Sequence, residues 1–117
     1  MKLLSPFGPK IAIIKIPKII INKINYEVDK ILDDKKRLKK SDYSKKLVGQ
    51  VQQEIQLDKK FIQKNLLKFI SVNVKKYIKK CTKKNVKKIS LKNLWVVRQF
   101  KNEYNPIHFH SGNISGV

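Results

Sequence analysis

The chain has 117 residues and a formal net charge of +20, from 28 basic and 8 acidic residues, which limits it to one domain or part of one. Its hydrophobic fraction of 41% allows a core, but no apolar run reaches the roughly 18 residues of a membrane span, and residues 1–9 are too short and proline-rich for a secretory signal. The single cysteine, Cys81, excludes an internal disulfide framework and fits a reducing cytosol, so we expect a cytoplasmic protein with Cys81 as a small core residue.

The first predicted elements are a strand and a helix. Residues 11–16 form a β-branched run that ends at Pro17, which predicts a strand. From Lys18 to about Lys40 the apolar residues recur at intervals of three and four, which predicts an amphipathic helix with a lysine-rich outer face: Ile20, Ile24, Val28, Ile31 and Leu32. Pro17 suits the entry of this helix. The polar segment 41–46 is expected to be a loop.

A second strand and a second helix follow. In residues 51–57 apolar and polar side chains alternate, which predicts a half-buried strand. Asp58 can then cap a helix. Helical spacing continues for about five turns, through Ile62, Leu66, Phe69, Ile70, Val74, Tyr77, Ile78 and Cys81, and weakens over residues 82–85.

The C-terminal part is predicted to be extended. Residues 89–100 have β character and lead to a turn at 102–106, after which we expect another strand that carries His108 and His110. The order β-α-β-α-β-β predicts an α+β fold in which sheet dominates toward the C-terminus.

Lysine doublets recur every four residues, at 75–76, 79–80, 83–84 and 87–88. On a helix they would form one slowly drifting stripe, which is either a phosphate-binding face or the solvated side of a helix. Of the 28 basic residues 26 are lysine, whereas proteins that read phosphates usually include arginine. The charge therefore predicts salt-sensitive, non-specific binding to nucleic acid and does not by itself predict specific recognition.

Both histidines of the chain lie two residues apart, in His108-Phe109-His110. On a strand such residues point to the same side, and two imidazoles spaced in this way can share one metal ion, with Phe109 on the opposite side. The turn at Asn105-Pro106 precedes the pair, and the glycines that follow it allow close approach of the backbone.

Two further residues are candidates for a pocket. Trp95 lies between apolar residues, where an aromatic side chain belongs to the core or to a pocket wall. Arg98 shares a face with Val96 and Phe100 by alternation, so it lines a cavity or extends to water.

Several blocks of the chain resemble a family of 2-oxoglutarate- and Fe(II)-dependent oxygenases of phage and marine bacterial genomes. The similarity is carried mainly by residues 95–100, by 103–112, which include Asn-Pro-Ile-His-Phe-His-Ser-Gly, and by Ile114-Ser115-Gly116-Val117. Residues 4–9 and 47–54 resemble the N-terminal region of that family.

The resemblance implies a double-stranded β-helix, or jelly roll, with the two amphipathic helices packed on its first strands. It implies Fe(II) held by two histidines and a carboxylate, and 2-oxoglutarate as a co-substrate that is decarboxylated to succinate while an unknown small-molecule or macromolecular substrate is oxidised. His108 falls at the first ligand position. His110 takes the position usual for the carboxylate, so it is a ligand, part of a variant with an exogenous ligand, or a neighbour of the ligands.

The resemblance also implies that residues 1–117 are a single incomplete domain, with an N-terminal strand and helix region at 1–90 and the start of the jelly roll at 91–117. The distal histidine and the basic residue for the co-substrate are then expected beyond Val117, and the 117 residues alone are expected to be inactive. The alternative is a small lysine-rich protein that binds nucleic acid through residues 75–88.

Overall fold

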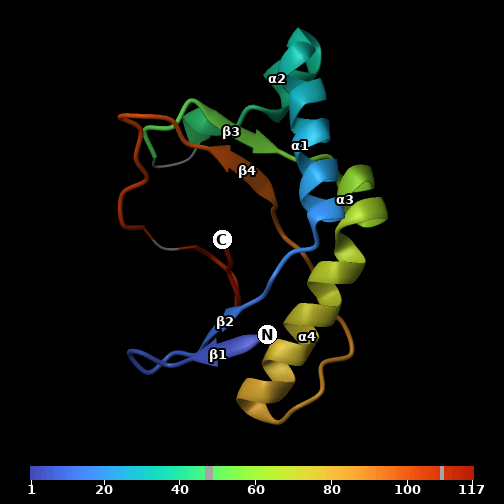
Figure 1. Ribbon diagram of the computed structural model, residues 1–117, viewed down its shortest axis with the longest axis vertical. Helices are drawn as coiled ribbons and strands as arrows, with labels where there is room; N and C mark the ends of the chain where they lie inside the picture. The colour runs from blue at the N-terminus through green and yellow to red at the C-terminus, as the bar shows by residue number, and fades with distance from the viewer. Residues whose placement is uncertain (47–48, 109) are drawn as a thin grey trace. The chain divides into compact units, whose positions relative to one another are not determined.

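The computed structural model describes residues 1–46, 49–108 and 110–117. Within these ranges the chain forms four α-helices and two antiparallel sheets of two strands each (Figure 1), which confirms the predicted mixture of helix and sheet. None of the helices in these ranges is long and apolar enough to cross a membrane. Phe109 lies outside the described residues, so its predicted orientation is not addressed.

The described residues group into two compact units. The first unit consists of residues 1–25 and 59–90, and the second of residues 26–58 and 91–117. Each unit is therefore built from two segments that are distant in the sequence.

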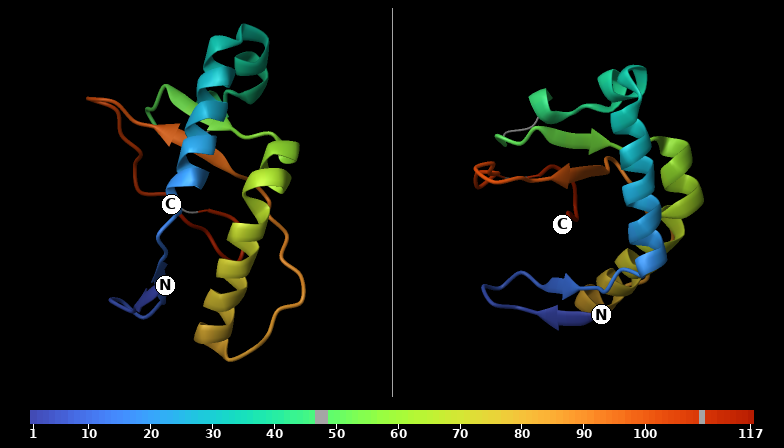
Figure 2. Two further views of the ribbon diagram at one scale, coloured as in Figure 1. Left: turned by 45° about the vertical axis from the view of Figure 1, so that its right-hand side comes forward. Right: turned by 45° about the horizontal axis from the view of Figure 1, so that its top comes forward.

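The first unit contains a hairpin in which β1 (Lys2–Leu4) pairs with β2 (Ile11–Ile13), as Figure 2 shows. β2 confirms the start of the strand predicted at 11–16, whereas β1 was not predicted because prolines and a glycine separate it from β2. In the connecting turn Gly8 has a φ of +97°, a conformation that glycine adopts without steric cost. The Ser5 hydroxyl donates to the Gly8 carbonyl at 2.9 Å and closes the turn.

Two helices occupy the segment in which one was predicted. α3 (Lys59–Asn65) begins directly after Asp58, and α4 (Leu67–Thr82) follows it with only Leu66 between them. The hydrogen bonds from Leu66 N to Ile62 O and from Ile70 N to Leu66 O continue across the junction, so the apolar side keeps its helical period. Ile62 and Leu66 are buried on that side.

α4 ends earlier than a stripe of four lysine doublets requires. Lys83 adopts a left-handed conformation with a φ of 63°, and its N–H donates to the Lys79 carbonyl, which terminates the helix. Only the doublets at 75–76 and 79–80 are therefore helical. The Lys75 ammonium donates to the Lys87 carbonyl at 2.8 Å, which holds the following segment beside α4.

A tyrosine joins α4 to the hairpin. The Tyr77 hydroxyl donates to the Lys10 carbonyl, and burial, with a smaller contribution from the Cys81 thiol, raises the pKa of Tyr77. Cys81 itself is half-buried, so it lies at the margin of the first unit and not in its core as predicted.

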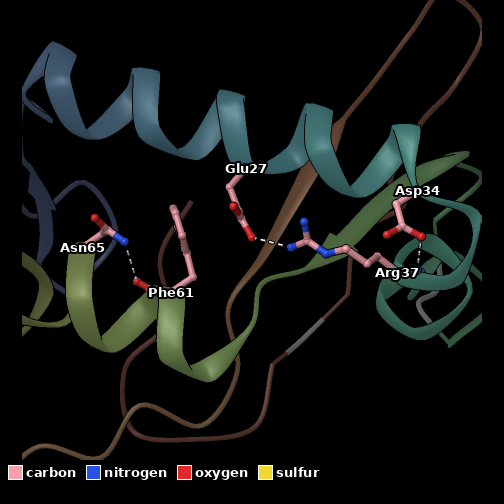
Figure 3. A network of polar contacts seen from close by, with 5 residues as sticks. All are labelled: Glu27, Asp34, Arg37, Phe61 and Asn65. Atoms are coloured by element: carbon pink, nitrogen blue, oxygen red, sulfur yellow. Dashed lines mark hydrogen bonds and ion pairs between the residues drawn. The ribbon is translucent and has the colours of Figure 1, made fainter.

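The helix predicted at 18–40 is also divided, into α1 (Lys18–Asp33) and α2 (Lys35–Ser41). Asp34 leaves the helical conformation, and its Oδ1 accepts hydrogen bonds from the Lys36 and Arg37 amides at 2.9 and 3.1 Å. Figure 3 shows the bond with Arg37. A carboxylate in this position satisfies amides that have no partner within the helix, so it starts α2. Beyond α2, residues 44–46 form a short 3₁₀ helix in the segment predicted to be a loop.

The second unit is organised by the pairing of β3 (Gln53–Gln56) with β4 (Trp95–Arg98). β3 lies within the predicted strand 51–57. The strand predicted at 89–100 is reduced to β4, because β3 offers backbone partners only over four residues and a strand without a partner leaves its amides and carbonyls unsatisfied. The Leu57 amide donates to the Leu94 carbonyl at 3.2 Å just outside the paired residues.

The two faces of this sheet have different neighbours. Arg98 lies on the same face as Val96, as predicted, and its guanidinium forms a 2.7 Å ion pair with Asp29 of α1. That face therefore lies toward the part of α1 that belongs to the second unit. The buried apolar residues of this unit are Val28, Ile31, Val51, Ile55 and Leu57.

Replacement of Asp34 by alanine is expected to reduce the free energy of unfolding by about 1 kcal/mol, because α2 loses its capping oxygen. Denaturant unfolding followed by circular dichroism measures the change. The adjacent variant Asp33→Ala removes the same charge without removing the cap, so an equal loss of stability in both variants would contradict this role of Asp34.

Candidate metal-binding site

The two histidines converge although no strand carries them. The Nε2 atoms of His108 and His110 are 3.1 Å apart, and the ring centroids are 4.6 Å apart with the planes at 71°. Both side chains are exposed. The predicted strand at this position is wrong for the described residues, whose backbone has no pairing partner here, but the predicted pairing of the imidazoles is present.

The hydrogen bond at Nδ1 determines which nitrogen of His108 is available. Nδ1 lies 2.7 Å from the Pro106 carbonyl oxygen, which can only accept, so Nδ1 carries the proton. In the neutral ring Nε2 then keeps its lone pair and faces His110. A backbone carbonyl that fixes the tautomer and orientation in this way is typical of histidines that bind metal ions.

The ring of His110 lies beside Trp95 of β4. Their centroids are 5.8 Å apart, with the planes tilted by 40°. Trp95 is opposite Gln56 in the sheet and shares a face with Glu54, on the side away from Arg98. Trp95 is half-buried and lies beside the ring of His110. Its prediction as a core or pocket-wall residue stays a prediction.

The loop between β4 and the histidines is held by hydrogen bonds that backbone amides donate. The Gln50 amide donates to the Tyr104 carbonyl at 2.9 Å, and the Glu103 carboxylate accepts from the amides of Gln52 and Phe100 at 3.1 and 2.9 Å. These bonds fix the loop at the residues immediately before Asn105. The position of His108 therefore depends on the segment that leads into β3.

A buried carboxylate also contacts the loop that carries His108. Glu54 is only 1% exposed, and its Oε2 atom has no hydrogen-bond partner among the described residues. Burial raises the pKa of Glu54 and the nearby Asp42 raises it further, while a hydrogen bond with Asn105 and the proximity of His108 act in the opposite direction. A carboxylate this deeply buried needs such partners to be tolerated.

Gly49 provides the space for Asn105. A Cβ atom at Gly49 would overlap the Asn105 side chain and would lie 3.5 Å from the Tyr104 carbonyl oxygen.

Sequence reasoning missed Glu54 because alternation along 51–57 assigned it to the solvent side. A single carboxylate that alternates with Gln52 and Gln56 carries no sequence signal of burial.

The geometry fits two ligands of one metal ion. Two nitrogens that are each about 2.0–2.1 Å from an ion, at an angle of about 90–110°, lie about 2.8–3.4 Å from each other. The observed separation of 3.1 Å falls in this range. Across the described ranges, no three His, Cys, Asp or Glu side chains are arranged to hold a metal ion together, and Arg98 lies on the other face of the sheet.

The second unit also has an open hollow of about 480 Å³, which is separate from this site. Its lining residues include Ser44, Lys45, Gln52 and Glu103 but neither histidine.

No protein-family model matches the chain, and no similar curated protein or solved structure was found.

Replacement of Glu54 by glutamine is expected to change how stability depends on pH. Because the pKa of Glu54 is raised in the fold, the protonated carboxyl favours folding below the ordinary value of 4.5, and this contribution is lost as the pH rises through the folded pKa. The stability of the parent protein relative to Glu54→Gln should therefore fall from acidic to neutral pH, as measured by urea unfolding over that range. The exposed substitution Asp33→Asn serves as a control, and parallel curves for Glu54→Gln and the parent would refute the assignment.

Proposed function

We propose that the chain belongs to a 2-oxoglutarate- and Fe(II)-dependent dioxygenase and that His108 and His110 bind its iron. The observation that carries the proposal is the convergence of the two Nε2 atoms at 3.1 Å, with the Nδ1 proton of His108 held by the Pro106 carbonyl. The Asn-Pro-Ile-His-Phe-His segment supports it, because imidazole nitrogens are the ligands that non-haem iron sites share.

Each residue of the site has a distinct part in this proposal. His108 presents a neutral Nε2 to the ion. His110 would bind the ion as the tautomer that carries its proton on Nδ1, with the Nε2 lone pair free, and its ring lies beside Trp95. When bound, Fe(II) supplies the oxygen chemistry that couples decarboxylation of 2-oxoglutarate to oxidation of a substrate.

Glu54 acts on this site indirectly. Its hydrogen bond with Asn105 fixes the loop three residues before His108, and Gly49 leaves room for that contact. We assign Glu54 and Asn105 as positioning residues, since the arrangement of ligands depends on the supporting contacts around them.

We further propose that the strands belong to a jelly roll. A jelly roll consists of two antiparallel sheets, and the pairs β1–β2 and β3–β4 are antiparallel as its strands would be. In this proposal the helices lie outside such a sheet structure. The side of β4 that carries Trp95 would face the iron.

The proposal is tested by anaerobic titration of the protein with Fe(II), alone and with 2-oxoglutarate. A co-substrate that chelates iron through its keto acid should tighten Fe(II) binding, whereas glutarate, which lacks the keto group, should not. His108→Ala and His110→Ala should each weaken Fe(II) binding by at least about 100-fold, because each removes one of the two imidazole ligands.

The neighbouring variant Ser111→Ala is the matched control and should bind Fe(II) as the parent protein does. Unchanged affinity in both histidine variants would exclude them as ligands. Iron binding that depends on the histidines but not on 2-oxoglutarate would support a metal site and refute the dioxygenase.

A further inference from the structure

The charge of the protein is distributed unequally between its two units. The first unit contains 17 of the 28 basic residues, all of them lysine, and none of the 8 acidic residues. The second unit contains the other 11 basic residues and every acidic residue. A bias toward lysine codons would raise the lysine content of both units. It would not explain why the first unit has no carboxylate side chain.

The second unit contains both partners of two ion pairs. Arg37–Glu27 and Arg98–Asp29 both lie in the second unit. In the first unit the lysines have no carboxylate side chain of the same unit to pair with, and their mutual repulsion opposes folding. Helical lysines four residues apart, such as Lys75 and Lys79, add to this repulsion.

Eight of these lysines are brought to one part of the first unit. Four belong to the last turns of α4, and four belong to the segment that the Lys75–Lys87 hydrogen bond holds beside it: Lys75, Lys76, Lys79, Lys80, Lys83, Lys84, Lys87 and Lys88. All eight side chains are exposed. We call this set the lysine surface.

The chemistry of the lysine surface favours the backbone of a nucleic acid duplex. A duplex carries about one negative charge per 1.7 Å of its axis. It can therefore offer a phosphate to each of several neighbouring ammonium groups. The surface has no arginine to read guanine bidentately, so contacts would be made to phosphates without sequence preference.

Two observations argue against other polyanions. The aromatic residues of α4, Phe69 and Tyr77, are both half-buried, so this helix offers no exposed ring on which the bases of a single strand could stack. Between the lysine doublets, Ile78 and Val86 are half-buried, so residues 75–88 present no exposed apolar side chain for insertion into a bilayer.

We infer that the lysine surface binds the phosphate backbone of double-stranded nucleic acid without sequence specificity. This binding is independent of the histidine site, which belongs to the second unit. An iron-dependent oxidation at that site would then be carried out by a protein held on a nucleic acid.

The experiment measures the affinity of the full chain for a short mixed-sequence DNA duplex by fluorescence anisotropy, over salt concentrations of about 50–200 mM. Lys76, Lys79, Lys80 and Lys84 are replaced together by glutamine, which spares the bonded Lys75 and the left-handed Lys83. The slope of log affinity against log salt should become shallower by about 3 to 4, since each lost phosphate contact contributes about 0.9.

The matched control replaces Lys35, Lys36, Lys39 and Lys40 of α2 by glutamine, which removes the same charge from the second unit. The slope should then change by less than about 1. Equal losses in both variants would show that net charge alone governs binding and would overturn the inference.

Four further measurements complete the test. The same four positions changed to arginine should retain the parent slope, and circular dichroism should show that the glutamine variant is folded. His108→Ala should bind duplex unchanged, which separates this inference from the proposed iron site. Tighter binding to phosphatidylcholine–phosphatidylserine vesicles or to polyglutamate than to duplex would assign the surface to another partner and refute the inference.

Discussion

The antiparallel register of β3 and β4 is the constraint on which the second unit depends. Glu54 stands opposite Val97 and Gln56 opposite Trp95, so one face of the sheet carries the carboxylate and the indole. The other face carries Arg98, which pairs with Asp29 of α1. A shift of one residue would exchange the faces of a strand and place Arg98 under the histidine loop.

This register places a costly group beneath the candidate site. A carboxylate that is 1% exposed, with one oxygen lacking a hydrogen-bond partner among the described residues, is less favourable for folding than an apolar side chain in the same place. Its hydrogen bond with Asn105 connects it to the loop that carries His108. Polar groups that oppose stability in this way are concentrated at functional sites, where they hold other side chains in position.

The first unit is under a different electrostatic constraint. Its lysines repel one another without a compensating carboxylate side chain in the same unit, yet the chain folds them beside each other through the contact between Lys75 and the Lys87 carbonyl. Bound anions would reduce this repulsion and so stabilise the first unit. The second unit, with all the acidic residues, is almost balanced in charge.

Apolar periodicity and local chemistry were sufficient to predict most of the elements. The β-branched run before Pro17, the alternation around Ile55 and the helical spacing from Ile62 to Cys81 each correspond to an observed strand or helix. The interruptions were not predicted, since Asp34 as a cap and Leu66 as a junction interrupt patterns that remain periodic on both sides. The prediction of a strand at 89–100 was wrong over most of its length. The extent of this strand is decided by its partner, β3, which lies about forty residues earlier in the chain.

By itself the sequence determined which residues could bind a metal ion, since both imidazoles of the chain lie two residues apart at His108 and His110. Only the tertiary structure decided that their Nε2 atoms converge, that Trp95 and Glu54 lie on the face beneath them, and that Arg98 does not. It also decided that the acidic residues are confined to one unit, because each unit combines segments that are separate in the chain. The physical reason is the same in both cases: side-chain chemistry is encoded locally, whereas proximity depends on strand register and on the packing of distant segments.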